Sequence, residues 1–233
     1  MITYKDFMEA RMSAAVKLQR ALERERVKSE ASRRRGEEVM AQAKAEAEKK
    51  MKQVKEEAEK HHVLAFGRMN PPTAGHETVV NKVLDVAKKT GGSHSVILSH
   101  SQDPKKNPLP PSQKLKHAKR FFPNTNIKVA SKSEPTLIHH AQRLNKAGHD
   151  HLIMVAGEDR VKEYHDLLHR YNGKPDKSGK IPFSFHKIDV VSAGARDPDA
   201  EGTEGMSASK MREHAKKGNF AEFRKGVPSH VSD

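Results

Sequence analysis

The sequence contains no cysteine and no tryptophan, and aromatic residues make up only 5% of its 233 residues. Without cysteine the chain can form neither a disulfide framework nor a thiolate metal site, which fits a reducing compartment. No stretch approaches the ~20 apolar residues of a membrane-spanning helix, and the first residues lack the apolar region of a signal peptide. These absences predict a cytoplasmic protein without a membrane segment.

Charge is what the sequence has in abundance, because Asp, Glu, Lys and Arg form 32% of the chain and hydrophobic residues only 34%. The formal net charge of +14 suits a polyanionic partner such as a nucleotide, pyrophosphate or nucleic acid. Nucleic acid is the less favoured of these partners, because the basic residues do not alternate with aromatic side chains on which bases could stack.

The first part of the chain reads as a helical arm. From Tyr4 to Lys60 there is no proline and one glycine, Gly36, among many Ala, Glu, Lys and Arg residues, which favour helix. Apolar residues recur at helical spacing in two narrow stripes, over residues 8–22 and 40–58. The run 33–36 between the stripes is a candidate break, and an unbroken helix of about fifty residues would reach roughly 75 Å.

A helix of that length must lie against something or pair with copies of itself. Its seam is rich in alanine and therefore weak for a coiled coil, so self-association, docking on another protein and exposure to solvent all stay open. We predict two domains, with a helical arm over residues 1–60 that serves interaction or oligomerisation and an α/β domain over residues 61–233.

Beyond the arm, apolar runs of strand length alternate with segments of helical periodicity. The predicted strands are 63–66, 95–99, 127–130, 151–156 and 181–191, and the predicted helices are 79–87, 112–122, 135–147, one ending near 171, 207–217 and a short one around 220–223. This alternation predicts an α/β fold with a doubly wound, mostly parallel Rossmann-like sheet that binds ligands at the carboxyl ends of its strands.

The stretch from Ala65 to His76 (AFGRMNPPTAGH) joins the first predicted strand to the first helix. A strand, a Gly/Pro-rich turn and a helix together bring backbone N–H groups and a helix N-terminus up to a phosphate. Gly67 permits backbone conformations that are closed to other residues, and Pro71-Pro72 stiffens the loop. Thr73 and His76 then place a hydroxyl and an imidazole at the start of the helix.

This stretch carries a resemblance to a known family. Residues 73–76 (TAGH) resemble the (H/T)-x-G-H motif of the nucleotidylyltransferase, or cytidylyltransferase-like, superfamily. Residues 67–72 (GRMNPP) resemble the G-R-F-x-P of its archaeal-type nicotinamide-mononucleotide adenylyltransferases. On its own the tetrapeptide is equally typical of a helix-capping turn, so the assignment depends on further motifs in the same domain.

Two loops after later strands extend the resemblance. Residues 99–109 (SHSQDPKKNPL) are similar to the S-x-Q…N-P-(F/L) loop that helps these enzymes bind substrate, although its lysines could equally be solvated. Residues 157–159 (GED) resemble the family's G-x-D element. There Gly157 would admit a ligand close to the backbone, and Asp159 could accept hydrogen bonds from a sugar or a base, or cap the following helix.

The segment 205–212 (GMSASKMR) matches the superfamily's I-S-S-T-x-x-R motif, with Ala208 in place of the second Ser and Ser209 in place of Thr. A helix that begins at these serines offers backbone N–H groups, hydroxyls and a guanidinium to triphosphate oxygens. The segment is also typical of an ordinary Ser-capped helix with an exposed Arg. Two motifs at the matching ends of an α/β domain, in the family's order, favour the functional interpretation.

The resemblance implies that a phosphate oxygen of a mononucleotide attacks the α-phosphorus of a nucleoside triphosphate, with pyrophosphate leaving and Mg²⁺ as the cofactor. Because the nucleophile is already anionic, catalysis would consist of positioning and charge stabilisation. The implied catalytic residues are Thr73, His76 and Arg212; those for nucleotide binding are Phe66, Gly67, Arg68, Gly75, Ser207, Ser209 and Lys210; and those for substrate binding are Asn70, Ser101, Gln102, Asn107, Gly157 and Asp159. No protein metal ligands are predicted, because paired histidines such as His165 and His169 have no third ligand at a fixed spacing.

We therefore predict an enzyme that joins ATP to nicotinamide mononucleotide, giving NAD and pyrophosphate. CTP in place of ATP, and another phosphomonoester in place of nicotinamide mononucleotide, stay open. The alternative from another functional class is a transferase-like interaction protein without activity. The arm and Ala208 favour this alternative, whereas the presence of His76 and Arg212 argues against it. An aminoacyl-tRNA synthetase relative is less favoured, because Gly205 stands where the K-M-S-K-S motif begins with Lys. The unusual arm is consistent with a phage-encoded protein.

Overall fold

The computed structural model describes residues 3–194 and 206–231. It divides into two units, Met1–Val54 and Lys55–Asp233. Gly205, where the predicted serine motif begins, lies outside the described residues. Within the described ranges, no helix is both long and apolar enough to cross a membrane.

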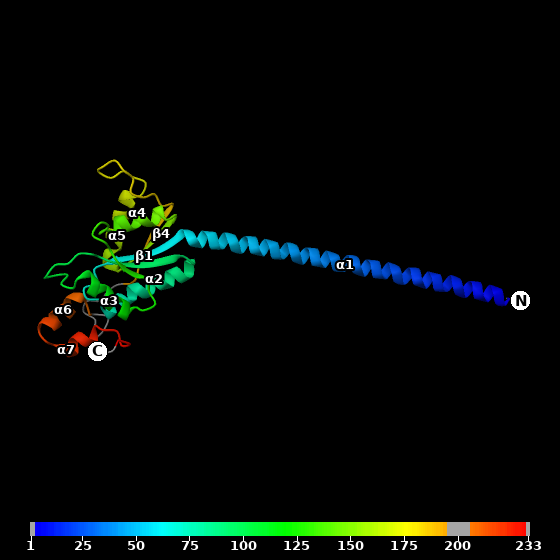
Figure 1. Ribbon diagram of the computed structural model, residues 1–233, viewed down its shortest axis with the longest axis horizontal. Helices are drawn as coiled ribbons and strands as arrows, with labels where there is room; N and C mark the ends of the chain where they lie inside the picture. The colour runs from blue at the N-terminus through cyan, green and yellow to red at the C-terminus, as the bar shows by residue number, and fades with distance from the viewer. Residues whose placement is uncertain (1–2, 195–205, 232–233) are drawn as a thin grey trace. The chain divides into compact units, whose positions relative to one another are not determined.

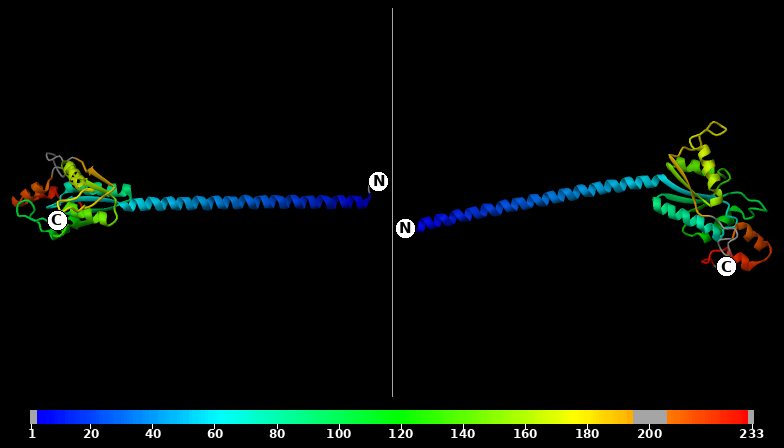
Figure 2. Two further views of the ribbon diagram at one scale, coloured as in Figure 1. Left: turned by 90° about the horizontal axis from the view of Figure 1, so that it is seen from above. Right: turned by 180° about the vertical axis from the view of Figure 1, so that it is seen from behind.

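Helix α1 runs from Tyr4 to Lys60, so the candidate break at residues 33–36 does not occur and the helix is continuous (Figure 2). Its 57 residues, at a rise of 1.5 Å each, give a length of about 85 Å. Gly36 costs a helix only about 1 kcal/mol relative to alanine. The Arg33 Nε–Glu37 Oε1 ion pair of 3.0 Å spans this point one turn apart and offsets part of that cost.

The second unit is built on a sheet of five parallel strands in the order β3-β2-β1-β4-β5, of which β1 and β4 are labelled in Figure 1. The strands are β1 (His61–Gly67), β2 (Ser93–Leu98), β3 (Ile127–Val129), β4 (His151–Ala156) and β5 (Lys187–Ser192). The middle strands are near-continuous buried apolar runs, as expected for a parallel sheet that is covered on both faces. The predicted Rossmann-like α/β fold is confirmed.

The helices of this unit are α2 (Glu77–Thr90), α3 (Pro111–Phe121), α4 (Leu137–Lys146), α5 (Glu158–Tyr171), α6 (Ala208–Lys216) and α7 (Phe220–Lys225). A short 3-10 turn, η1 (Ala74–His76), precedes α2. Val63 and Ala65 of β1 belong to the core cluster that contains residues of α2 and α3, whereas Leu64 belongs to the cluster with residues of α4 and α5. Because alternate strand residues face opposite sides of a sheet, the sheet is wound on both faces.

One predicted strand is too long. The structure begins β5 at Lys187, whereas we expected a strand from residue 181 to 191. Phe183 and Phe185 are buried at strand-like spacing, but side-chain amides take the place of a neighbouring strand. Ser184 N donates to Asn145 Oδ1 at 3.0 Å, and Phe185 N donates to Asn172 Oδ1 at 2.7 Å. The predicted strand is therefore confirmed from residue 187 on, whereas residues 181–186 are not part of it.

Of the two roles open to Asp159, the structure does not show the helix cap. The residue that caps α5 is Gly157, whose carbonyl accepts from Arg160 N at 2.9 Å, and Asp159 lies within the first turn. A carboxylate in the first turn still interacts favourably with the positive end of the helix dipole. Asp159 is exposed, so its side chain remains available to a ligand.

Candidate functional site

The strand order creates a single point at which the chain reverses its direction across the sheet. From β1 the chain moves outward through β2 to β3, and α4 then carries it back to β4 on the other side of β1. In open α/β sheets, ligands bind at such a switch point, beyond the carboxyl ends of the strands. A pocket of about 260 Å³ lies there, lined by residues 65–70, which end β1 and begin the loop after it, and by residues 155–157 at the end of β4.

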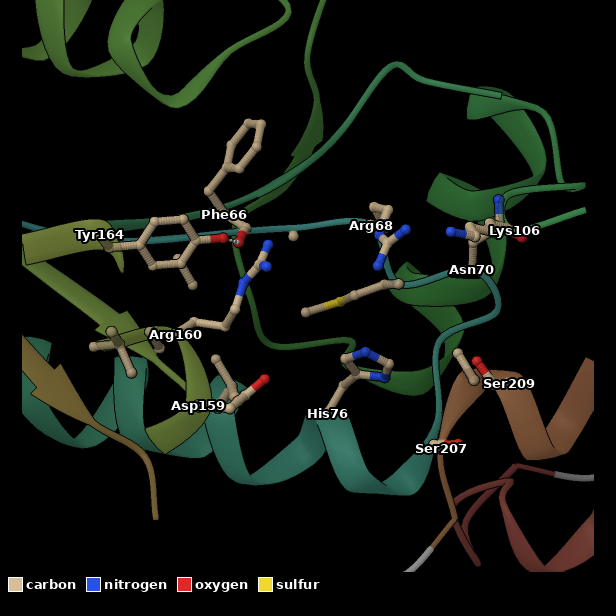
Figure 3. Close-up of a pocket in the computed structure, with 18 of the residues that line it drawn as sticks. Phe66, Arg68, Asn70, His76, Lys106, Asp159, Arg160, Tyr164, Ser207 and Ser209 are labelled. Carbon is tan, nitrogen blue, oxygen red and sulfur yellow. Dashed lines mark hydrogen bonds between the residues drawn. The ribbon is translucent and has the colours of Figure 1, made fainter. Parts of the chain in front are cut away.

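The pocket is strongly basic. Among the described residues that line it, Arg68, Lys106, Arg160 and Arg212 are cationic and Asp159 is the only carboxylate. The first residues of α5 and α6 also line it, so two helix N-termini add their partial positive charge. Figure 3 shows Phe66, Arg160 and Tyr164 towards one end of the pocket and Arg68, Asn70, Lys106, Ser207 and Ser209 towards the other, with His76 between them. This field suits a ligand with several negative charges.

Arg212 is held in place by two hydrogen bonds, one to the loop after β1 and one within α6. Its Nη1 donates to the backbone carbonyl of Asn70 at 2.6 Å, and its Nη2 donates to Ser209 Oγ at 3.0 Å. Burial, and then the charge of Arg68, lower the pKa of Arg212, yet a guanidinium remains charged at neutral pH. Two cations placed close together in this way are more stable when an anion lies between them.

His76 is oriented by Thr73. The backbone N–H of Thr73 donates to His76 Nδ1 at 3.1 Å, and the Thr73 hydroxyl lies 2.8 Å from the same nitrogen. Because Nδ1 accepts a hydrogen bond, the proton of the neutral ring lies on Nε2. Thr73 is only 1% exposed and does not line the pocket, whereas His76 does. The hydroxyl therefore fixes the imidazole, which can present an N–H donor to the pocket.

The loop after β2 is tied to the loop after β1 through two asparagines. Asn70 Nδ2 donates to Asn107 Oδ1 and, at 3.0 Å, to the carbonyl of Leu109, whose N–H donates back to Asn70 Oδ1 at 3.1 Å. Asn107 Nδ2 donates to the carbonyl of Ser101 and, at 2.7 Å, to its hydroxyl. Both asparagines are 1% exposed. The side chain of Asn107 thus braces this loop from within.

The same loop presents Lys106. The backbone N–H groups of Lys105 and Lys106 donate to Asp103 Oδ1 at 3.1 and 2.6 Å, which closes a turn. The hydrogen bond from Lys106 N lowers the pKa of Asp103, so this carboxylate keeps its charge and holds the turn. Lys106 lines the pocket and Lys105 does not.

The structure brings together most of the residues that the motifs indicated. Those that line the pocket are Phe66, Gly67, Arg68, Asn70, His76, Gly157, Asp159, Ser207, Ser209 and Arg212. Those that lie outside its lining are Thr73, Gly75, Ser101, Gln102, Asn107 and Lys210. Two of these are accounted for locally, because Gln102 Nε2 donates to the carbonyl of Pro108 at 3.2 Å and Lys210 N donates to Ser207 Oγ at 3.1 Å. The second contact makes Ser207 the cap of α6.

Arg160 and Tyr164 line the pocket but did not emerge from the sequence. The Tyr164 hydroxyl donates to the carbonyl of Phe66 at 3.0 Å, and burial raises the pKa of Tyr164, so the phenol stays neutral. The Arg160 guanidinium lies 5.6 Å from the centre of the Tyr164 ring and pairs with Glu163 at 3.0 Å. Their spacing of one and five residues after Asp159 puts all three on one helix, which is the signal that could have found them.

The described residues contain no group of three His, Asp or Glu side chains that could hold a metal ion. The carboxylate of Asp159 is the one acidic group in the described lining of the pocket. Mg²⁺ in nucleotide sites is commonly held by waters, substrate phosphates and one or two carboxylates. The donor set therefore fits a Mg²⁺ ion that arrives with a nucleotide, with Asp159 as its available protein ligand.

The fold and the basic pocket at its switch point are typical of α/β proteins that bind nucleotides. Residues 64–214 match the family model described as cytidylyltransferase-like. The chain belongs to this cytidylyltransferase-like family and is a nucleotidyltransferase, which confirms the resemblance of its motifs to the superfamily.

The other comparisons are more distant. Among solved structures, the chain is similar to the nicotinic acid mononucleotide adenylyltransferase of Plasmodium falciparum complexed with NaAD, at 15% sequence identity and a TM-score of 0.49. That match covers 72% of this chain and 91% of the other. No curated protein matches the chain.

Proposed function

We propose that the protein transfers the adenylyl group of ATP to nicotinamide mononucleotide, giving NAD and pyrophosphate. The observation that carries the transfer reaction is the pocket with Arg68, Lys106, Arg160 and Arg212 at the switch point of the sheet. A triphosphate and a phosphomonoester together bring several negative charges into one small volume. Cationic side chains and helix N-termini are the groups that can offset that charge.

In the proposed reaction, a phosphate oxygen of the mononucleotide attacks the α-phosphorus of ATP in line with the leaving group. The bond from the α-phosphorus to its bridging oxygen breaks, and this oxygen departs as part of pyrophosphate. The nucleophile carries its own negative charge, so the reaction needs no general base. Mg²⁺ carried by the triphosphate would neutralise part of the charge on the leaving group.

The residues of the pocket would divide this work between them. The serine hydroxyls and N–H groups at the start of α6, with Arg212 and Arg68, are suited to hold the β- and γ-phosphates. His76, with its proton on Nε2, can donate to an oxygen of the α-phosphate as charge builds up there. Arg160 stands towards the opposite end of the pocket (Figure 3) and is suited to the phosphate of the acceptor.

The choice of ATP and nicotinamide mononucleotide rests on the resemblance of residues 67–72 and 99–109 to the corresponding adenylyltransferase loops. CTP in place of ATP, or another phosphomonoester in place of nicotinamide mononucleotide, would make the same contacts with the cationic groups. The substrates must therefore be decided by experiment.

A product assay tests the proposal. The purified protein is incubated with Mg²⁺, with ATP or CTP, and with nicotinamide mononucleotide, its nicotinic acid analogue, pantetheine phosphate or glycerol phosphate, and the adducts are separated by chromatography. We expect NAD from ATP and nicotinamide mononucleotide, at least tenfold faster than any other adduct. Faster formation of another adduct would retain the transfer reaction and replace the substrate. Absence of every adduct from folded protein would contradict the proposal.

A further inference from the structure

Lys114, in the first turns of α3, is a fully buried lysine without a carboxylate partner among its described hydrogen bonds. Its Nζ donates to the backbone carbonyls of Ser99 at 2.5 Å and Ser101 at 3.1 Å. Lysine is almost never fully buried unless it is paired, because removing an ammonium group from water is costly. Burial lowers the pKa of Lys114 to about 8, so at neutral pH the group is still mostly charged.

A continuous series of hydrogen bonds runs from this lysine to the phosphate-binding side of the pocket. The carbonyl of Ser101 that accepts from Lys114 also accepts from Asn107 Nδ2. Asn107 Oδ1 accepts from Asn70 Nδ2, and the backbone carbonyl of Asn70 accepts from Arg212 Nη1 at 2.6 Å. The series joins α3, the loop after β2, the loop after β1 and α6.

The loop after β2 depends on such side-chain hydrogen bonds for its conformation. Residues 99–110 contain no helix or strand, and the described contacts that bend the loop back on itself are an isolated bridge between Asp103 and Asn107 and side-chain hydrogen bonds. An ammonium group has three donors, which lets one side chain hold two carbonyls at the carboxyl end of β2. A neutral apolar residue at 114 would take this donor from both carbonyls, one of which belongs to the buried Ser99, and the loop would be free to move away from Asn70.

We propose that Lys114 is a positioning residue that, through Asn107 and Asn70, fixes Arg212 for its hold on the triphosphate. This inference rests on the proposed function, in which Arg212 binds the β- and γ-phosphates. Lys114 does not line the pocket. Its effect should therefore appear mainly in properties that depend on Arg212, with a smaller part from Lys106, which the same loop presents to the pocket.

The test measures binding of inorganic pyrophosphate and of Mg²⁺–ATP, without acceptor, by titration calorimetry. The proteins are the wild type, Lys114→Met, Arg212→Ala, the double variant and the control Lys116→Met. Lys116 is exposed on the same helix. We expect Lys114→Met to weaken binding of both ligands about tenfold and Lys116→Met to change it less than twofold. In the Arg212→Ala background, Lys114→Met should change the dissociation constant less than twofold, because the residue it positions is gone.

Each failure has its own signature. A wild type that binds neither ligand would overturn the proposed function, and this inference with it. A wild type that binds both, with a Lys114→Met protein that binds equally well, would overturn the inference alone. An equal loss in both backgrounds would show a general structural role and would also overturn it. If Lys114→Met does not fold, Asn107→Ala interrupts the same series closer to Arg212, and the same tenfold and less-than-twofold changes are expected.

Discussion

The guanidinium of Arg212 donates to the backbone carbonyl of Asn70 across 142 residues of sequence, at 2.6 Å. This hydrogen bond joins helix α6 to the loop that follows the central strand. A second link lies nearby, where Ala74 N donates to the carbonyl of Gly226 at 2.8 Å. The two ends of the family motif are thereby assembled into one site, so a ligand between them is met by groups whose spacing is already set.

Replacing Arg212 with lysine should be damaging although charge is kept. An ammonium group cannot donate to the Asn70 carbonyl, Ser209 and a phosphate in the planar fork that a guanidinium provides. We expect Arg212→Lys to lower kcat/KM for the triphosphate about 10–100-fold, the size of a lost hydrogen bond to a charged group of about 1.5–3 kcal/mol. The exposed Arg170, changed to lysine, is the control. Steady-state kinetics that give the two variants equal activity would count against this role.

His76 should matter for turnover more than for binding. Its Nε2–H is suited to charge that develops at the α-phosphate, so His76→Ala should lower kcat about 100-fold with a smaller effect on KM. Thr73→Val removes the hydroxyl on Nδ1 but keeps the backbone donor, so a drop of about tenfold is expected, with Thr73→Ser close to wild type. Rapid-quench measurement of adduct formation checks both. A loss below tenfold for His76→Ala would remove His76 from the catalytic residues.

The protein should lose stability in mild acid because two buried histidines resist protonation. Burial lowers the pKa of His62 to about 3 and that of His140 to about 4, whereas in the unfolded chain both are near 6.5. Below pH 6.5 the unfolded state therefore binds more protons, and the free energy of unfolding falls as the pH falls towards 4. From pH 7 to pH 5, each histidine should contribute a loss of about 2 kcal/mol.

Urea unfolding at both pH values isolates the share of His62. This side chain is 6% exposed and lies between the hydroxyls of Ser93 and Ser95, at 2.7 and 2.8 Å. His62→Gln should lose about 2 kcal/mol less than the wild type between pH 7 and pH 5, while the exposed His186→Gln should behave like the wild type. The same acid loss in all three proteins would show that His62 is not the cause.

The transferase unit should function without most of the arm. All residues that line the pocket lie in the unit Lys55–Asp233. We expect deletion of residues 1–54 to leave kcat/KM within about twofold and the unfolding midpoint of the unit unchanged. A large loss of activity would assign the arm a part in the site.

Self-association is the property that the same deletion should remove. Of the thirteen large hydrophobic side chains exposed among the described residues, eleven lie on α1, from Tyr4 to Val54. Such a surface favours a protein partner, and a second copy of the arm is the simplest one. Light scattering should give a multiple of 26.1 kDa for the full chain and a monomer after the deletion. An unchanged oligomeric state would exclude the arm as the site of association.

The motifs predicted which residues meet in the pocket best where a motif lies at the end of a strand or the start of a helix. Gly67 ends β1, His76 immediately precedes α2 and Arg212 lies in α6, and the fold fixes the order of these elements, so the convergence of the three residues could be anticipated. Ser101 and Asn107 were expected at the substrate, but they hold the loop from within instead of lining the pocket. Sequence spacing places a loop near a site, but it does not show which polar side chains of the loop form hydrogen bonds with the loop's own backbone.

Lys114 is a residue whose place in the structure could not be predicted from the sequence. A lysine in an amphipathic helix is normally solvated, so nothing in its neighbourhood indicates complete burial. Its role depends on carbonyls 13 and 15 residues earlier in the chain, which only the folded loop brings to it. Likewise, Gly36 alone does not show whether α1 is broken. Its cost of about 1 kcal/mol is small against the sum of propensities over a helix of 57 residues.

The most direct test of the account is ³¹P NMR of the wild-type protein with Mg²⁺, ATP and nicotinamide mononucleotide, with His76→Ala and His186→Ala proteins in parallel. Attack at the α-phosphorus predicts pyrophosphate and a dinucleotide diphosphate in equal amounts, formed by the wild type and His186→Ala and about 100-fold more slowly by His76→Ala. Release of orthophosphate with ADP, or equal rates in all three proteins, would contradict nucleotidyl transfer at this pocket.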